Sequence, residues 1–247
     1  MIEHSTPYGR LIVGVPPELF ARAVGLMETQ RARSASGNFL WALTGGSTPK
    51  DWYRWCVAEK ALPAGLLETV HWTVSDERCV PVASEESNFG NADRLLLTPL
   101  GVPLAHKHPW AVDELTPTAA AADYARRIAN LVGEKKTYAG CFLGMGPDAH
   151  TASLFPGSPL LASDDDRLFA AVEAPGKGWR LTLTPAGLRA CGLIVVMALG
   201  EAKAPALQRV MTGPHEPWKN PAQVLKTCAD RVVWLVDEAA AAGLGRN

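Results

Sequence analysis

The sequence lacks the features that mark secreted and membrane-spanning proteins. Its five cysteines are dispersed without Cys-x-x-Cys spacing, at positions 56, 79, 141, 191 and 228. Such an odd, scattered set is typical of reduced thiols in a cytosolic protein. No apolar run reaches the roughly 18 residues that a membrane span needs, and residues 1–10 lack the apolar block of a signal peptide. We therefore expect a cytoplasmic protein that does not enter a membrane.

The chain also has almost no net charge. Its 24 Lys and Arg residues and 25 Asp and Glu residues leave a formal charge of -1, so no overall field attracts nucleic acid or an anionic membrane. Any anion-binding site must be local. A length of 247 residues with 47% hydrophobic residues suits one large α/β domain, and no linker or repeat divides the chain. We predict a single domain over residues 1–247, as a monomer or a weak homodimer.

Two common catalytic signatures are missing as well. The His-Glu-x-x-His motif is absent, and His106 and His108 lie in a proline-rich loop, where we expect exposed side chains rather than metal ligands. The Gly-x-Ser-x-Gly turn of serine hydrolases is also absent, because Ser47 lacks the second glycine. The sequence therefore predicts neither a metal site nor a serine nucleophile.

A dinucleotide-binding turn is a further hypothesis. Residues 144–149 loosely match the pattern Gly-x-Gly-x-x-Gly/Ala, and Glu173 lies about where an acidic ribose partner is sought. However, Pro147 removes a backbone donor from the turn, and Asp148 would repel a pyrophosphate placed there. We therefore predict no nicotinamide cofactor.

The chain does contain a regular alternation of short apolar segments with helical patterns. Strand-like segments cover residues 38–43, 70–74, 138–143, 193–199 and 232–236, with shorter candidates at 168–172 and 180–183. Helical patterns cover residues 16–33, 116–132 and 184–191, and others begin near residues 52, 87 and 201 and after the last strand. The apolar segments show no period-two alternation, as in parallel strands that helices cover on both faces. We predict an α/β protein with a single doubly wound, mainly parallel, Rossmann-like sheet and helices on both faces.

Polar residues follow three of these strands, at positions 44–50, 75–78 and 144–150. Parallel strands place their carboxyl ends on one edge of the sheet, so we expect the three segments to line a single pocket. The first contains Gly45-Gly46-Ser47-Thr48. It is either an anion-binding turn before a helix, or a tight turn in which a hydroxyl side chain caps that helix. The residues alone leave both interpretations open.

The second and third segments carry the candidate chemistry. Asp76 and Arg78 are solvated charges, a mutual ion pair, or part of a site in which the planar arginine fork binds phosphate or carboxylate. His150 follows Asp148 by two residues. An imidazole that a carboxylate holds in one tautomer can take a proton from water and return it to a leaving group.

Two more cations lie near predicted helix starts. Arg180 precedes Leu-Thr-Leu-Thr at 181–184, and Lys203 follows Gly-Glu-Ala at 200–202. Taken singly, such residues are more often surface charges than ligands. Near helix starts, they could instead complete an anion site.

Together these motifs resemble the family that contains 6-phosphogluconolactonases and glucosamine-6-phosphate deaminases. The resemblance spans nearly the whole chain, and the run 144–157 is its most specific part. The other matching segments are residues 43–49, 76–78 with 87–89, 180–184 and 234–238. The resemblance implies a cytosolic hydrolase of the oxidative pentose phosphate pathway. Such an enzyme opens 6-phosphoglucono-δ-lactone to 6-phosphogluconate on a Rossmann-like fold, without a required cofactor.

The resemblance also implies roles for individual residues. His150 looks like the general base that activates water, Asp148 like the residue that orients it, and Asp76 lies near the sugar. The remaining residues resemble substrate ligands: Arg180 and Lys203 for the phosphate, Gly46, Ser47 and Thr48 for the turn beside it, and Arg78 to bind or polarise the substrate. The expected partner is a sugar phosphate lactone.

The chain departs from the family pattern at two places. Ala149 stands where the family usually has glycine, and if that position needs a positive φ, alanine costs about 1 kcal/mol. Segment 175–179 lacks the usual lysine-proline-rich sequence, and its Lys177 has no assigned role. Two alternatives stay open, a deaminase and a sugar-phosphate sensor that has lost turnover. Arg78, where deaminases generally have tyrosine, and the uncharged residues 151–155 favour the lactonase.

Overall fold

A computed structural model describes residues 1–34, 38–133, 136–162 and 166–245. The main sheet has seven strands in the order β1-β2-β10-β9-β6-β3-β4. These strands are β1 (Ile2–Thr6), β2 (Gly9–Gly14), β3 (Phe39–Leu43), β4 (Val70–Val74), β6 (Gly140–Gly144), β9 (Ile194–Ala198) and β10 (Val232–Asp237). Every neighbouring pair is parallel except β1 with β2. The prediction of a mainly parallel sheet is confirmed.

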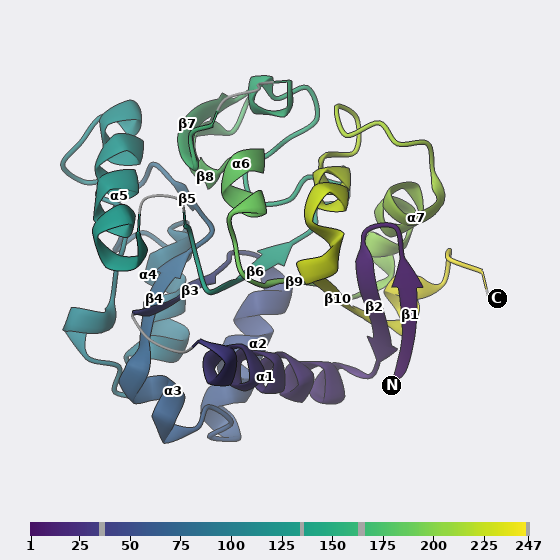
Figure 1. The fold of residues 1–247 in the computed structure, drawn as a ribbon, viewed down its shortest axis with the longest axis horizontal. Coiled ribbons are helices and arrows are strands. Elements are labelled where there is room, and N and C mark those ends of the chain that lie inside the picture. Colours follow the sequence, from purple (N-terminus) through teal and green to yellow (C-terminus); the bar gives the residue numbers. More distant parts are fainter. Residues whose placement is uncertain (35–37, 134–135, 163–165, 246–247) are drawn as a thin grey trace.

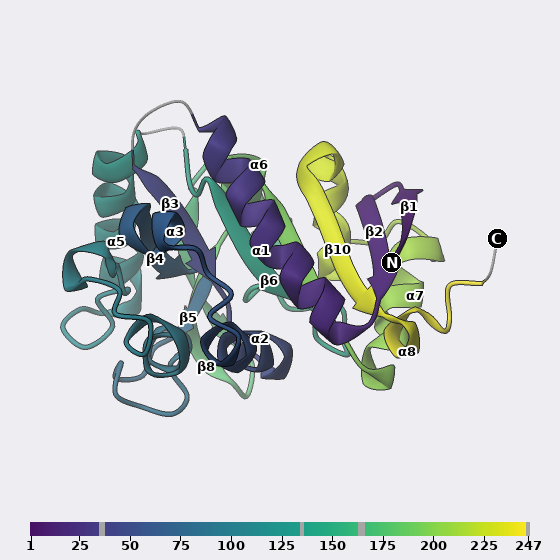
Figure 2. The same ribbon diagram turned by 90° about the horizontal axis from the view of Figure 1, so that it is seen from below.

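Helices cover both faces of this sheet, which is why β3 and β9 are buried along their whole length. α1 (Pro16–Arg33) and α2 (Ser47–Ala58) lie on one face, and α6 (Pro185–Arg189) and α7 (Ala204–Thr212) lie on the other (Figure 1). Figure 2 shows α1 lying over the sheet, roughly along the direction of β10. The doubly wound, Rossmann-like class predicted from the sequence is therefore confirmed.

Aromatic side chains join α2 to the sheet directly beneath the carboxyl ends of the strands. Trp41 of β3 and Trp52 of α2 both pack edge-on against Phe142 of β6, with ring centroids 5.2 and 4.8 Å apart. All three side chains are fully buried. Aromatic pairs of this geometry contribute about 0.5–1.5 kcal/mol beyond the area they bury. The start of α2 is therefore held firmly against the ends of β3 and β6.

The remaining helices are mostly short. They are α3 (Ala64–Thr69), α4 (Asn88–Ala92), α5 (Pro117–Val132) and α8 (Glu238–Ala241), with a π-helical turn at Asp93–Leu97 and 3-10 segments at Leu104–His106, Pro159–Leu161, Glu201–Lys203 and Pro221–Arg231. Ser87 caps α4, since its side chain accepts a hydrogen bond from the N–H of Gly90. Thr116 precedes α5, but its side chain makes no capping bond.

A second, antiparallel sheet lies beside the main one, and the prediction of a single sheet did not include it. Its strands are β5 (Asp76–Arg78), β8 (Gly178–Leu183) and β7 (Phe169–Ala174), in that order. Only Ser75 separates β4 from β5, so the chain passes directly from one sheet to the other. The ring of Tyr124 in α5 lies 5.0 Å from that of Phe169, which ties the helix to the small sheet.

The expectation that His106 and His108 are exposed is wrong. Both are partly buried against His71 of the edge strand β4, with ring centroids 4.6 and 5.0 Å from its ring. No group of three or more metal-ligating side chains is found within the described residues. In the same part of the chain, none of the helices is long and apolar enough to cross a membrane.

Candidate active site

The polar strand ends meet where the direction of winding of the sheet changes. The chain leaves β3 through α2 toward β4, whereas it leaves β6 toward β9 on the opposite side. Because β3 and β6 are neighbours, the loops that follow them diverge and leave a crevice between them. Ligands of open α/β sheets bind in such a crevice, outside the carboxyl ends of the strands.

A cavity of about 600 Å³ opens at this crevice. It is lined by eight of the nine predicted site residues, namely Gly46, Ser47, Thr48, Asp76, Arg78, His150, Arg180 and Lys203. The ninth, Asp148, is hydrogen-bonded to His150. The lining comes from the ends of β3 and β6, the small sheet and the 3-10 turn before α7. The fold thus brings all the candidate residues to one place.

The first wall of the cavity is the start of α2. Gly46, with a φ of +107°, is the residue before the helix, and no side chain caps the first turn. The interpretation of Ser47 or Thr48 as a cap is therefore wrong, because both lie inside the helix. The first N–H groups of a helix have no partner within it, and the helix dipole adds positive potential there. This end of α2 is suited to hold an anion.

The turn after β6 holds His150 and Asp148 together. The Nδ1 atom of the imidazole is hydrogen-bonded to Oδ1 of Asp148, and the same oxygen accepts the backbone N–H of His150 at 3.2 Å. The N–H of Gly146 donates to the carbonyl of His150 at 2.9 Å and closes the turn. Because Nδ1 is engaged, Nε2 is the ring nitrogen left to exchange a proton with a ligand.

Two backbone positions make this turn possible. A Cβ at Gly146 would lie 2.0 Å from Nδ1 of His150 and 2.6 Å from Oδ1 of Asp148, so only glycine leaves room for the pair. Ala149 lies between the two side chains in the sequence and has a φ of +61°. The condition under which alanine is costly at this position is met, so Ala149 carries a strain of about 1 kcal/mol.

The surroundings favour an ionised carboxylate at Asp148. Its partial burial raises the pKa of the carboxyl, but the hydrogen bonds and charge of His150 outweigh that effect, and Lys177 adds to them. The pKa of Asp148 therefore lies below its ordinary value. A carboxylate in this place fixes the imidazole tautomer and stabilises the imidazolium form.

Asp76 is in a different environment. Its side chain is 9% exposed, and it accepts hydrogen bonds from the hydroxyls of Ser153 at 2.8 Å and Ser75 at 3.3 Å. Burial raises the pKa of Asp76, and the hydrogen bond from Ser153 and the charge of His150 offset this only in part. The interpretation of Asp76 as a solvated charge is wrong. The structure also places Arg78 nearest to Glu86, at 3.9 Å, rather than in an ion pair with Asp76.

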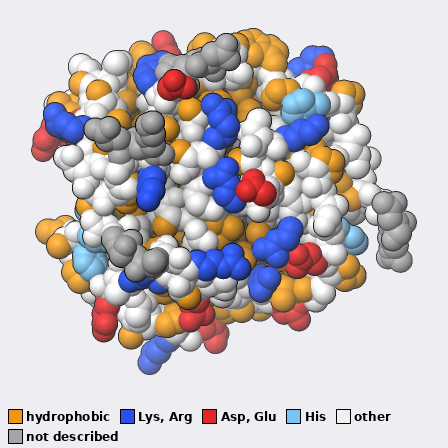
Figure 3. Space-filling model, viewed as in Figure 1, with side chains coloured by type: hydrophobic (Ala, Val, Ile, Leu, Met, Phe, Trp, Pro, Cys, Tyr) orange, Lys and Arg blue, Asp and Glu red, His pale blue; other side chains and the backbone are white. Residues whose placement is uncertain are grey.

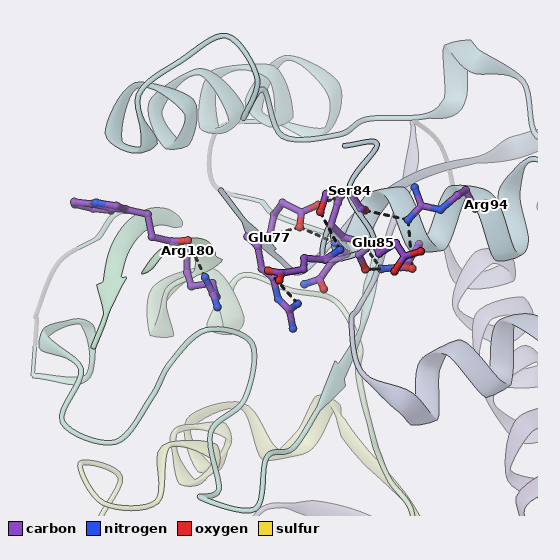
Figure 4. A network of polar contacts seen from close by, with 11 residues as sticks. Glu77, Ser84, Glu85, Arg94 and Arg180 are labelled. Carbon is purple, nitrogen blue, oxygen red and sulfur yellow. Dashed lines mark hydrogen bonds and ion pairs between the residues drawn. The ribbon is translucent and has the colours of Figure 1, made fainter. Parts of the chain in front are cut away.

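Glu77 points to the opposite side of β5 and anchors it. It is 1% exposed and accepts hydrogen bonds from the N–H groups of Arg78, Asn88 and Phe89 at 2.7–2.8 Å and from the hydroxyl of Ser87 at 3.0 Å. Burial raises the pKa of Glu77 to about 7 despite these bonds. Figure 4 shows Glu77 at the centre of this network, between Arg180 and the group of Ser84, Glu85 and Arg94. The network fixes β5 to the start of α4, so that Asp76 and Arg78 face the cavity.

Cations gather at the cavity. Arg78 and Arg180 are directly opposite each other on β5 and β8, an arrangement that is unfavourable for like charges. Burial and the charge of Arg78 lower the pKa of Arg180, and burial lowers the pKa of Lys203. Elsewhere, Lys and Arg side chains are interspersed with acidic ones, as Figure 3 shows for one face. A bound anion would relieve the repulsion between the two arginines.

Sequence reasoning missed several residues that line the cavity. Ser153, Phe155 and Lys177 all do so, and so does Asn88, whose side-chain N–H donates to the carbonyl of Asp76 at 2.9 Å. Ser153 and Phe155 belong to the run 144–157, but their part in the site depends on side-chain directions that no spacing rule reveals. For Lys177, the segment 175–179 departs from the family pattern, so no motif assigns it a role.

The site can be compared with known proteins. A family model described as glucosamine-6-phosphate isomerases/6-phosphogluconolactonase matches residues 18–234. The chain belongs to this family. The resemblance inferred from the motifs is therefore confirmed, and the match covers all nine predicted site residues.

Individual relatives agree with this assignment. Proteins named 6-phosphogluconolactonase from Rattus norvegicus and Homo sapiens are each 34% identical to the chain. The rat alignment covers 92% of this chain and 90% of that protein, and the human alignment covers 89% and 84%. The solved structure of 6-phosphogluconolactonase from Trypanosoma cruzi superposes with a TM-score of 0.80 at 28% identity, over 96% of this chain and 97% of that one.

Proposed function

We propose that this protein hydrolyses 6-phospho-D-glucono-1,5-lactone to 6-phospho-D-gluconate in the oxidative pentose phosphate pathway. The observation that carries the proposal is the His150–Asp148 pair at the wall of a cavity rich in cations. The lactone has an electrophilic carbonyl, which the water activated by the base can attack, and an anionic phosphate, which the cations can bind. The names of the relatives support the same reaction.

In the proposed reaction, His150 takes a proton from water as the water oxygen bonds to C1 of the lactone. The carbonyl oxygen becomes an oxyanion in the tetrahedral intermediate. When the bond between C1 and the ring oxygen breaks, His150 returns the proton to that ring oxygen. Asp148 orients the imidazole and stabilises its charged form. The reaction needs no covalent intermediate with the protein.

We assign the phosphate to the start of α2, where the N–H groups of Ser47 and Thr48 lack partners within the helix, together with Arg180 and Lys203. The turn at Gly46 lets the chain approach a ligand closely. Asp76 is buried and close to His150, and is suited to hold a sugar hydroxyl. Arg78, opposite Arg180, is suited to bind the phosphate or polarise the substrate.

A glucosamine-6-phosphate deaminase is the second candidate. The family model includes both activities, and a base, a carboxylate and a phosphate site would serve either reaction. Arg78 lines the cavity where the deaminase branch generally has tyrosine, which favours the lactonase. A sensor that binds sugar phosphates without turnover is a third candidate, which the strained Ala149 motivates.

One assay separates these functions. Freshly prepared 6-phosphogluconolactone, corrected for spontaneous hydrolysis, is compared with glucosamine 6-phosphate as substrates of the same preparation. We expect hydrolysis of the lactone, and a loss on the order of 100-fold or more in His150→Ala with an unchanged melting temperature. His4→Ala, the same change at an exposed position on β1, is the control. Full turnover in His150→Ala would refute the role of the base, and binding without turnover by the unaltered protein would favour the sensor.

We also propose that residues 1–247 form one domain in the cytoplasm. A continuous core of buried apolar side chains extends from Tyr8 to Ala240, which supports one folding unit. Five free cysteines, four of them buried, are consistent with a reducing compartment.

A further inference from the structure

Lys177 lies in the turn that joins β7 to β8. The glycines on either side of it, Gly176 and Gly178, have φ values of +70° and +72°, and the N–H of Lys177 donates to the carbonyl of Ala174 at 2.9 Å. Although the residue is exposed, it lines the cavity. The left-handed glycines give this turn a shape that carries a long basic side chain over the site.

The ammonium group of Lys177 rests on an aromatic ring that also touches the proposed base. Its Nζ lies 4.2 Å from the centroid of the Phe155 ring, and that ring lies 4.6 Å from the ring of His150 at an angle of 37°. Within the described part of the chain, Lys177 forms no ion pair. Its charge nevertheless contributes to lowering the pKa of Asp148. The cation is therefore close to the reacting end of the cavity, and among the described residues no carboxylate lies within ion-pair distance of it.

We propose that Lys177 is a catalytic residue that stabilises the oxyanion formed on the lactone carbonyl. This inference rests on the proposed function, because the oxyanion exists only if water adds to C1. The water oxygen must lie beside His150, so C1 and its oxygen lie beside the imidazole too. The ammonium on Phe155 has a flexible four-carbon stem and three donors with which to reach that oxygen. It donates hydrogen bonds as the charge develops and keeps its own protons throughout.

A residue that stabilises the oxyanion can be distinguished from one that binds the phosphate. The phosphate ligands proposed above belong to α2, β5, β8 and the 3-10 turn before α7, whereas Lys177 belongs to the β7–β8 turn and its ammonium lies over the ring of Phe155, next to His150. A donor that acts only as the oxyanion forms changes kcat, because it is stronger in the transition state than in the bound substrate. A phosphate ligand binds substrate and transition state alike and changes KM.

The test uses Lys177→Met and Lys177→Arg, assayed with 6-phosphogluconolactone. We expect Lys177→Met to lower kcat on the order of 100-fold with little change in KM, as for the loss of an oxyanion donor elsewhere. Lys177→Arg should recover part of that loss. Sorbitol 6-phosphate, which has the phosphate but no carbonyl, should inhibit all variants with the same inhibition constant. Lys219→Met, at an exposed lysine paired with Glu216, is the matched control and should behave as the unaltered protein.

Each other outcome overturns the inference. A raised KM and a weaker inhibition by sorbitol 6-phosphate in Lys177→Met would make Lys177 a phosphate ligand. Unaltered kinetics would show that the ammonium takes no part. If the unaltered protein fails to hydrolyse the lactone at all, the proposed function fails, and the inference fails with it. Equal melting temperatures for all variants exclude an effect through folding.

Discussion

Gly146 offers the sharpest test of how the site is built. In Gly146→Ala, the new Cβ would lie 2.0 Å from Nδ1 of His150 and 2.6 Å from Oδ1 of Asp148. Gly146 does not have a positive φ, so an alanine backbone is unstrained there and only the clash matters. The two side chains are 27% and 39% exposed, so they can yield toward the cavity while the fold persists.

The size of the effect follows from this geometry. To reach ordinary contact distance, the imidazole must move by about 1 Å or more, and a displacement of that size at a reacting group can cost about 100-fold in rate. Overpacking costs about 1–3 kcal/mol in a rigid core and less where side chains can move outward. We therefore expect kcat/KM for the lactone to fall about 100-fold. The free energy of unfolding should fall by less than the roughly 1–3 kcal/mol that overpacking costs in a rigid core.

Gly144→Ala is the matched control. It lies two residues earlier in the same run, and an added Cβ there would meet nothing closer than the carbonyl oxygen of Gly45 at 3.7 Å. Initial rates across pH and urea unfolding are measured for both variants. Wild-type kcat/KM in Gly146→Ala, or equal losses in the two variants, would refute the argument that Gly146 makes room for the pair.

Three further predictions concern stability. Ala149→Gly relieves a strain of about 1 kcal/mol but removes a buried methyl group worth about 0.8 kcal/mol. Denaturant unfolding should therefore show little net change in the free energy of unfolding. A large loss would mean that the packing of the methyl group outweighs the strain. Glu77→Gln should lower the free energy of unfolding by about 1–3 kcal/mol, because an amide NH₂ would face N–H donors; calorimetry showing no change would contradict this. Burial and the charge of His71 lower the pKa of His108 to about 4. The unfolded chain therefore binds more protons between about pH 6.5 and 4, and stability falls as pH falls through this range. His108→Gln should flatten that part of the melting curve against pH, and an unchanged slope would refute it.

The main sheet could be predicted because its strands carry strong local signals. β3 and β9 are buried on both faces, and their uniformly apolar sequences reflect this. α1 and α5 each begin with a proline in the first turn, such as Pro117 in α5. Proline is favoured at that position because its missing N–H would have no partner within the helix. Local signals of this kind depend only on neighbouring residues.

The small sheet could not be predicted in the same way. β5 has only three residues, all charged, and its pairing with β8 joins positions about a hundred residues apart, such as Arg78 and Arg180. Charged residues after an apolar strand usually lie in a solvated loop. Burial of Asp76 and Glu77 depends instead on partners such as Ser153 and Ser87, which no local pattern links to them. Local patterns therefore predict that the candidate residues lie at one edge of the sheet, but not the partners that bury Asp76 and Glu77.

Several departures from local stability rules lie at the cavity. Ala149 has a left-handed backbone, Arg78 and Arg180 face each other as like charges, Asp76 is a buried carboxylate, and α2 begins without a capping side chain. Each of these features opposes folding or adds nothing to it. Strain of this kind persists where the surrounding structure enforces it, and it concentrates at sites that bind or react. An anionic substrate would neutralise the arginines and satisfy the free N–H groups of α2, so the same features that cost stability in the free protein would favour the bound state.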